Sequence, residues 1–238
     1  MPDRFAFRQV DYRDIPTFLA DGEIRSKNHG APQRCHQTSL PGLVGLRSTG
    51  AFTLPYGGVV NDYVAFYFSP LTSFTCSIHR ESVEVIDPNG VKLGMSKLDD
   101  RAFIVCRTDG FPASGAPYCF SDYPLNSMAP LPTLSADIGQ LETHVHWSVF
   151  DDYPLTARIP EIGYDGVCKF FFNKFPPPKY QLRKQQRMAE FLVKDAVSLQ
   201  QVTCIVVPSD GMKRTIQAQV DTSGWGTPVL EKPGCFVR

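Results

Sequence analysis

The sequence predicts one domain of the α+β class, built mainly from short β-strands with a few short helices. Its 238 residues contain 20 scattered prolines, which interrupt regular structure often and therefore favour short elements joined by loops. A hydrophobic content of 42% is enough for a globular core, and no change in composition marks a domain boundary. We therefore expect residues 1–238 to form a single domain.

Short apolar and aromatic runs predict the strands, because such runs fit a pleated, half-buried surface. The predicted strands cover residues 63–69, 82–86, 102–107 and 202–207, and another begins at residue 191. Two segments lack such runs. Residues 26–56, rich in Ser, Gly, Pro and His, predict a long, partly ordered segment, and residues 111–135 predict a Pro- and Ser-rich loop.

The helices are expected to be few and short. The predicted helical segments cover residues 13–20, 181–189 and 210–219. The first should end near Gly22, because glycine readily adopts the backbone conformation that terminates a helix. The last places Met212, Ile216 and Val220 on one face, which is typical of a helix packed on a core.

Several classes of protein are excluded by composition. No apolar run is long enough to cross a bilayer, and residues 1–4 carry no stretch of the signal-peptide type, so we expect a cytoplasmic protein without membrane contact. Seven cysteines without CxxC spacing favour buried, reduced thiols. His144 and His146 lack a third and fourth ligand at suitable spacing, so no metal is expected.

One stretch is strongly basic, although the formal net charge of the chain is zero. Its cations are Lys169, Lys174, Lys179, Arg183, Lys184 and Arg187. Aromatic residues lie between them, at residues 170–172, Phe175 and Tyr180. Because bases stack on aromatic rings while phosphates pair with cations, this pattern is typical of single-stranded nucleic-acid binding. A buried strand is an equally good interpretation of residues 170–172.

Three segments are more specific together than any of them is alone. Residues 57–70 read GGVVNDYVAFYFSP, residues 183–193 read RKQQRMAEFLV, and Phe7-Arg8 precedes the first helix, which runs into LADGEI. In this order and spacing, the chain resembles the DarT family of DNA ADP-ribosyltransferase toxins over residues 6–207. The resemblance implies an ADP-ribosyltransferase-like fold with a split, mostly antiparallel β-core and short flanking helices. It also implies that NAD is consumed as a substrate and that no metal is required.

The resemblance assigns catalytic roles to Glu190 and Arg47. When NAD loses nicotinamide, positive charge develops on the ribose; a nearby carboxylate stabilises that charge and accepts a proton from the attacking base. A guanidinium can bind the pyrophosphate of NAD or polarise the base. Without the family motifs, a solvated glutamate at a helix end and a solvated loop arginine are the ordinary interpretations.

The same resemblance places Phe7, Arg8, Asn28 and Tyr67, together with Arg47, at the NAD-binding site. Tyr67 would stack on nicotinamide, although a core aromatic with a satisfied hydroxyl is nearly as good an interpretation. Phe7-Arg8 stands where many family members have an aromatic–His pair, and Arg8 can donate to a ribose hydroxyl. Asn28 falls at the position of a polar residue that contacts NAD.

The segment before Glu190 is expected to bind and select the target. The DNA-binding residues expected there are Lys179, Tyr180, Arg183, Lys184 and Arg187. The expected partner is single-stranded DNA, modified on guanine or thymine, with guanine slightly favoured by the departure at Phe7-Arg8. Transfer onto RNA and a non-enzymatic nucleic-acid-binding module are the alternatives. The resemblance further implies a toxin of a toxin–antitoxin or phage-defence system, with a macrodomain-type antitoxin as its partner.

Overall fold

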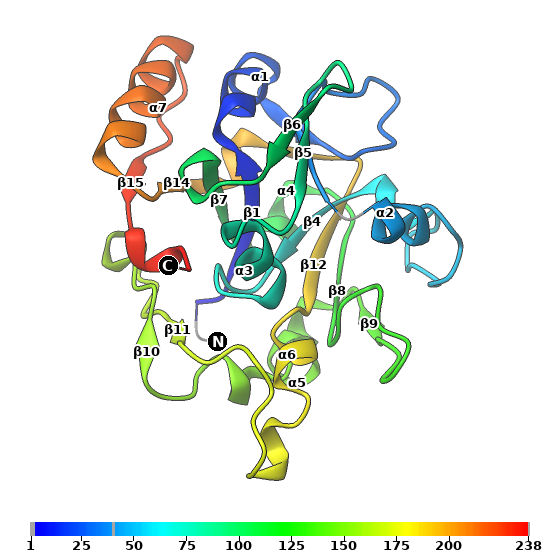
Figure 1. The fold of residues 1–238 in the computed structure, drawn as a ribbon. Coiled ribbons are helices and arrows are strands. Elements are labelled where there is room, and N and C mark those ends of the chain that lie inside the picture. Colours follow the sequence, from blue (N-terminus) through cyan, green and yellow to red (C-terminus); the bar gives the residue numbers. More distant parts are fainter. Residues whose placement is uncertain (1–2, 40, 238) are drawn as a thin grey trace.

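The computed structural model describes residues 3–39 and 41–237. Within these residues the largest sheet has eight strands and forms the centre of the molecule (Figure 1). In spatial order its strands are β15 (Val229–Glu231), β14 (Val202–Val207), β7 (Arg101–Arg107), β1 (Phe5–Asp11), β4 (Tyr63–Tyr67), β12 (Glu190–Lys194), β8 (Tyr118–Ser121) and β9 (Leu134–Ser135).

This sheet is split between β1 and β4. β1 pairs with β7 at all seven of its residues, but with β4 at a single register position, Phe7 opposite Tyr67. The described neighbours in the sheet run antiparallel, except for the parallel pair of β14 and β15. The architecture is therefore α+β with a split, mostly antiparallel core, as the resemblance implies.

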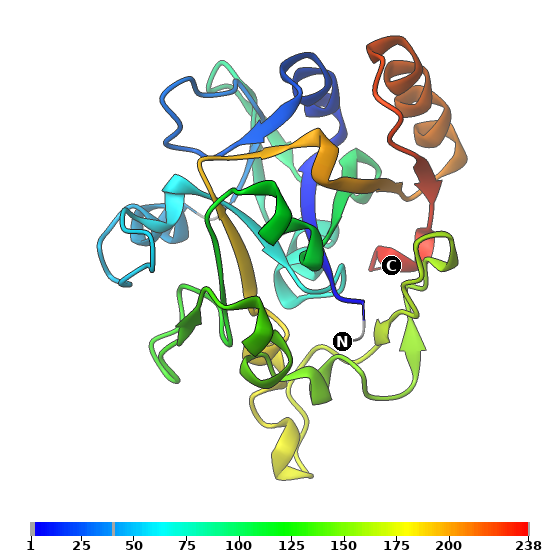
Figure 2. The same cartoon turned by 180° about the vertical axis from the view of Figure 1, so that it is seen from behind.

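Smaller sheets and short helices surround the core. The small sheets pair β10 (Leu155–Thr156) with β11 (Val167–Cys168), β13 (Ala196–Ser198) with β2 (Glu23–Arg25), and β5 (Glu84–Ile86) with both β3 (Gln37–Thr38) and β6 (Lys92–Met95). The α-helices are α1 (Ile15–Asp21), α2 (Pro41–Arg47), α3 (Ser73–His79), α4 (Phe111–Ser114), α5 (Leu141–His144), α6 (Arg183–Gln186) and α7 (Asp210–Ser223). In both views α1 lies beside α7, and α2 lies at the edge of the molecule that is nearer to β12 than to β14 (Figure 2).

An aromatic cluster fixes the orientation of β12. Phe191 is fully buried, and its ring lies 5.0 Å from that of Phe111 and 6.2 Å from that of Phe68, measured between centroids. It also stacks on Phe120 of the neighbouring strand. Because successive side chains of a strand point to opposite faces, this packing turns Glu190 to the other face of the sheet.

Most of the predicted elements are present. The structure has strands β4, β5, β7, β12 and β14 and helices α1, α6 and α7 in the predicted segments. α1 ends at Gly22, which has a left-handed φ of 72°. Met212, Ile216 and Val220 are the buried face of α7, as predicted.

Several elements are not predicted from the sequence, and two regions bear on the central sheet. Residues 111–135 are not a loop throughout, because they contain α4, β8 and β9, and β8 pairs with β12. The strand at Phe5–Asp11 is not predicted from the sequence, yet β1 lies in the middle of the sheet. In both cases the backbone hydrogen bonds of neighbouring strands, rather than local composition, determine the structure. The segment 26–56 includes β3 and α2, and Leu40 lies outside the described residues.

Candidate active site

A cavity of about 490 Å³ borders both strands at the split of the sheet. Its volume lies in the range of small-molecule and cofactor sites, about 300–1,000 Å³. Its lining includes four of the residues expected at the NAD site and the expected catalytic glutamate: Phe7, Arg8, Arg47, Tyr67 and Glu190. The structure therefore brings together residues from β1, α2, β4 and β12.

Arg47 and Glu190 form an ion pair in this cavity. Nη1 of Arg47 donates to Oε1 of Glu190 at 3.0 Å, and Nη2 donates to Oε2 at 2.8 Å. Glu190 is 2% exposed, and the Arg47 side chain is 20% exposed. Burial alone would lower the pKa of Arg47, but the Glu190 carboxylate raises it above its ordinary value. The two side chains therefore meet in the two-point geometry that arginine and carboxylate favour.

Backbone hydrogen bonds also fix the position of Glu190. The Leu125 N–H donates to Oε1 of Glu190 at 2.9 Å, and the Glu190 N–H donates to Oγ of Ser121 at 3.0 Å. The Ser121 hydroxyl in turn donates to the carbonyl of Tyr123 at 2.7 Å. Ser121 thus links the first residue of β12 to the turn that presents the Leu125 amide. No sequence signal marks this arrangement, because Leu125 acts through its backbone.

Tyr67 and Arg8 line the cavity beside this pair. Tyr67 stands opposite Glu190 in the register of β4 and β12, and burial together with the Glu190 charge raises the pKa of its hydroxyl. Nη1 of Arg8 donates to the carbonyl of Ala65 at 2.9 Å, while its Nε is buried without a hydrogen-bond partner. Burial lowers the pKa of Arg8. Arg8 therefore has donor capacity left for a ligand.

Phe7 borders the cavity, but its ring packs against other aromatic side chains. The side chain is fully buried, and its ring packs 6.3 Å from that of Phe103 and 5.0 Å from that of Tyr164. Its ring therefore belongs to the core.

Asn28 is not among the residues that line the cavity. Its Nδ2 donates to Oδ1 of Asp62 at 2.8 Å, and its N–H donates to the carbonyl of Asn61, so it supports the turn before β4. Asn61 lines the cavity instead, and its Nδ2 donates to Oγ of Ser48 at 2.6 Å, just past α2. Asn28 therefore borders the turn rather than the cavity in this structure, and its contact with NAD stays a prediction.

Arg187 is buried rather than presented to DNA. Its side chain is fully buried and donates to the carbonyls of Cys168 at 2.8 Å and Leu71 at 2.9 Å and to Oγ of Ser69 at 2.9 Å. Burial lowers its pKa to about 10, so it remains a cation at neutral pH. These bonds join the basic stretch of residues 169–187, called the basic loop from here on, to the segment after β4. The assignment of Arg187 is therefore corrected from DNA contact to structural support.

Arg183 and Tyr180 are also internal. Arg183 is 1% exposed; its Nη2 donates to Oδ2 of Asp152 at 2.8 Å, and its guanidinium lies 3.7 Å from the centroid of the Tyr180 ring. Tyr180 is itself 8% exposed. A direct phosphate contact by Arg183, or base stacking on Tyr180, is thus not available in this conformation. Lys179 and Lys184 are exposed, as a DNA-binding role requires.

The basic loop also presents aromatic rings to solvent. The exposed fractions are 46% for Phe170, 43% for Phe172 and 68% for Phe175. Phe171 alone of the triplet is buried, with its ring 4.6 Å from that of Phe172. The buried-strand interpretation of residues 170–172 is therefore wrong, since two of the three rings are exposed.

Among the residues that the structure describes, no group of three or more His, Cys, Asp and Glu side chains could hold a metal ion.

The seven cysteines are free thiols, and Cys35 is the only one that is not fully buried. Over the same described ranges, no helix is both long enough and apolar enough to traverse a bilayer.

Comparison with known proteins supplies the remaining observation. The family model described as "ssDNA thymidine ADP-ribosyltransferase, DarT" matches residues 7–237. The structure of Thermus sp. 2.9 DarT in complex with NAD+ is similar, with a TM-score of 0.71, 17% identity and 98% of each chain covered. The same protein with ADP-ribosylated ssDNA has a TM-score of 0.75 and 15% identity over 98% of this chain and 96% of that one. Thermosipho africanus DarTG with ADP-ribose has a TM-score of 0.63 and 14% identity over 98% of this chain and 51% of that one. A search of curated proteins finds no match.

Proposed function

Because the chain belongs to the DarT family of ssDNA thymidine ADP-ribosyltransferases, we propose that it transfers ADP-ribose from NAD to a base in single-stranded DNA. The observation that carries this proposal is the Arg47–Glu190 pair inside the cavity at the split of the sheet. Complexes of the similar Thermus protein with NAD+ and with ADP-ribosylated ssDNA support both substrates. The proposal treats residues 1–238 as one ADP-ribosyltransferase domain.

In this proposal Glu190 is the catalytic carboxylate. The bond between the nicotinamide nitrogen and ribose C1′ breaks, nicotinamide leaves with the bonding electrons, and positive charge develops on the ribose. A nitrogen of the base forms the new bond to C1′, and its proton passes to the Glu190 carboxylate. Glu190 suits this role because hydrogen bonds from Arg47 and from the Leu125 amide fix the orientation of its carboxylate within the cavity.

Arg47 is the second catalytic residue of the proposal. Its guanidinium has five N–H donors, of which two are directed at Glu190. The remaining donors suit a phosphate oxygen of NAD or a carbonyl oxygen of the base. Polarising that carbonyl makes the neighbouring ring N–H more acidic, which helps Glu190 to remove the proton.

The NAD side of the site is assigned to Arg8 and Tyr67, with Phe7 and Asn28 as supports. Arg8 has a buried Nε without a partner, and the Tyr67 side chain borders the cavity beside Glu190. Arg8 is therefore proposed to donate to a ribose hydroxyl and Tyr67 to pack on nicotinamide. Phe7 is proposed to support the cavity by packing in the core. Asn28 is proposed to support it through its hydrogen bond to the turn before β4.

The DNA side is assigned to the exposed part of the basic loop. Lys179 and Lys184 are proposed to pair with phosphates, because both are exposed and lie between the aromatic rings and Glu190 in the sequence. Phe170, Phe172 and Phe175 supply flat surfaces for bases. Arg183, Arg187 and Tyr180 are proposed to hold this loop in place from within.

Thymine is the proposed target base. The family description names thymidine, which outweighs the slight preference for guanine drawn from Phe7-Arg8. Thymine has one ring N–H, at N3, between two carbonyls, and this arrangement suits a carboxylate acceptor and a guanidinium donor acting together. The family resemblance also supports a role as a toxin that a macrodomain-type antitoxin counteracts, and the similarity to a DarTG protein agrees with this.

The test is a transfer assay with defined oligonucleotides. The purified protein is incubated with NAD and single-stranded DNA that contains all four bases, or lacks thymine, or lacks guanine, and with RNA of the same sequence. Mass spectrometry should show a gain of one ADP-ribose on the DNA strands that contain thymine. Gain only on strands that contain guanine would identify guanine as the target base, and gain only on RNA would identify RNA as the substrate. No gain on any strand, with NAD binding intact, would overturn the enzymatic proposal.

A further inference from the structure

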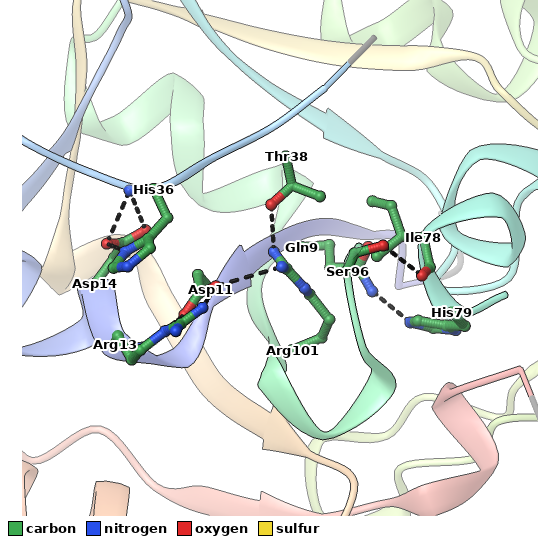
Figure 3. A network of polar contacts seen from close by, with 10 residues as sticks. All are labelled: Gln9, Asp11, Arg13, Asp14, His36, Thr38, Ile78, His79, Ser96 and Arg101. Carbon is green, nitrogen blue, oxygen red and sulfur yellow. Dashed lines mark hydrogen bonds and ion pairs between the residues drawn. The ribbon is translucent and has the colours of Figure 1, made fainter. Parts of the chain in front are cut away.

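The cavity contains a second polar cluster away from the Arg47–Glu190 pair. Figure 3 shows the polar network to which it belongs, and six of the residues drawn line the cavity: Gln9, Asp11, Asp14, His36, Thr38 and Arg101. Asp11 ends β1, four residues beyond Phe7, which corresponds to about 13 Å along a strand. The cavity thus extends from the Glu190 pair toward this cluster, with Arg8 interacting electrostatically with both Arg47 and Asp14.

Arg101 has hydrogen-bond donors in this cluster that no protein group satisfies. It is 2% exposed, and its Nη1 donates to Oγ1 of Thr38 at 2.7 Å. Its Nη2 lies 3.3 Å from Oδ2 of Asp11 as an ion pair, but neither Nη2 nor Nε makes a hydrogen bond. Buried donors without acceptors are destabilising, so a ligand with acceptor oxygens is the simplest completion of this end of the cavity.

Asp14 is held in position by His36. The His36 N–H lies 3.1 Å from both carboxylate oxygens, and its Nδ1 lies 2.7 Å from Oδ1. The Asp14 side chain is only 5% exposed, and burial raises its pKa. Its oxygens keep lone pairs for a further donor, since a carboxylate can accept about four hydrogen bonds. This end of the cavity therefore presents a fixed acceptor beside unsatisfied donors.

The two carboxylates of the cluster disfavour an anionic ligand. Asp11 accepts from Arg13 at 2.7 Å and pairs with Arg101, so the charge of Arg101 is already compensated by a carboxylate. A phosphate placed here would lie next to two buried carboxylates, and like charges at low dielectric repel strongly. A pair of hydroxyls, by contrast, can donate to Asp14 and accept from Arg101.

We propose that this cluster is the subsite for the adenosine ribose of NAD, and that it rejects the 2′-phosphate of NADP. The inference rests on the proposed function, because it takes the dinucleotide as the occupant of the cavity. A carboxylate that hydrogen-bonds the ribose 2′-hydroxyl is a general device for selecting NAD, whereas a free arginine accommodates a 2′-phosphate. Here Asp11 neutralises Arg101, and Asp14 remains as the acceptor.

The test compares NAD with NADP in two measurements. Calorimetry with the intact protein, without DNA, should show NAD binding at least about tenfold more tightly than NADP, since loss of one hydrogen bond to a charged group has that effect. In the transfer assay, Asp14→Asn should raise KM for NAD about tenfold, with a smaller change in kcat, and should reduce the preference for NAD over NADP. Asp99→Asn is the matched control, because this exposed carboxylate precedes Arg101 by two residues and lies outside the cavity.

Equal binding of the two dinucleotides by the wild-type protein would overturn the proposal without any variant. A folded Asp14→Asn protein that keeps the KM of the wild type would overturn it as well. If Asp14→Asn does not fold, the wild-type comparison decides. A protein that selects NAD in calorimetry yet modifies no oligonucleotide would contradict the proposed activity and leave this subsite standing, so the two failures are distinguishable.

Discussion

The guanidinium of Arg47 donates to both carboxylate oxygens of Glu190, at 3.0 Å and 2.8 Å, across 143 positions of sequence. The Leu125 amide completes the environment of the same carboxylate. Without substrate, both oxygens of Glu190 therefore have partners. Removing either member of the pair leaves the other charged group with fewer partners in a largely buried site.

Glu190→Gln should abolish most of the transfer while NAD still binds. The amide keeps the shape of the side chain but cannot stabilise positive charge or accept the proton from the base, so the rate should fall about 10²–10⁴-fold. Mass spectrometry of the oligonucleotide gives the rate, and calorimetry gives NAD affinity. Glu231→Gln, at an exposed position of β15, is the control. Near-normal transfer by Glu190→Gln would remove Glu190 from its catalytic role.

Ser121→Ala should lower kcat more than it changes KM for NAD. The hydroxyl accepts from the Glu190 N–H and donates to the Tyr123 carbonyl, so its loss frees the start of β12 and the turn that presents the Leu125 amide. We expect kcat to fall roughly tenfold and the free energy of unfolding to decrease by about 1–2 kcal/mol. Steady-state kinetics and urea unfolding measure both. An unchanged kcat together with the loss of stability would show that Ser121 supports only the fold.

Lys184→Ala and Lys179→Ala should weaken DNA binding in a salt-dependent manner. Each exposed lysine that pairs with a phosphate contributes about 0.7 to the slope of log affinity against log salt for a single strand. Fluorescence anisotropy at several salt concentrations measures the slope.

Arg187→Met provides the contrast to the lysine variants. Because Arg187 is fully buried and satisfies acceptors on two segments, its replacement should lower the free energy of unfolding by about 3 kcal/mol or more. The fraction that folds should keep the salt slope of the wild type. A reduced salt slope with an unchanged free energy of unfolding would instead show that Arg187 contacts DNA.

Phe175→Ala should reduce affinity for single-stranded DNA without a loss of stability. The ring is 68% exposed, so little core packing is removed, whereas stacking of a base on an aromatic ring is worth about 1–3 kcal/mol. The measurement is anisotropy with a short thymine-containing oligonucleotide. Phe171→Ala is the buried counterpart and should mainly lower thermal stability. Wild-type affinity in Phe175→Ala would place the DNA path elsewhere.

His79 should make stability depend on pH below neutrality. Burial, with the charge of Arg101, lowers its pKa from 6.5 to about 4, and its Nδ1 accepts from the Val237 N–H. The unfolded chain therefore binds this proton at higher pH than the folded chain. The contribution is complete above about pH 6.5 and is lost as pH falls toward 4, amounting to about 3 kcal/mol. Urea unfolding of the wild type and His79→Gln between pH 7 and 4 should show a difference that shrinks as pH falls; a constant difference would contradict this origin.

Local pattern predicted several elements because their residues repeat with the period of the structure that they form. The aromatic run of β4 and the Met212, Ile216 and Val220 face of α7 are such cases. β1 and β8 escaped prediction. Each is stabilised by hydrogen bonds to strands distant in sequence, β7 for one and β12 for the other. Such pairings leave no periodic trace in the residues themselves.

The sequence by itself determined the class of fold, the family motifs, and Glu190 and Arg47 as a candidate pair. Only the tertiary structure decided which charged residues face a ligand. Arg183, Lys184 and Arg187 lie within five positions of one another, yet two are buried and Lys184 is exposed. The structure likewise brought Asp14, His36 and Arg101 together from separate segments. The burial of a side chain and its hydrogen-bond partners depend on segments far apart in the chain, whereas charge and periodicity can be read from residues that are adjacent in the sequence.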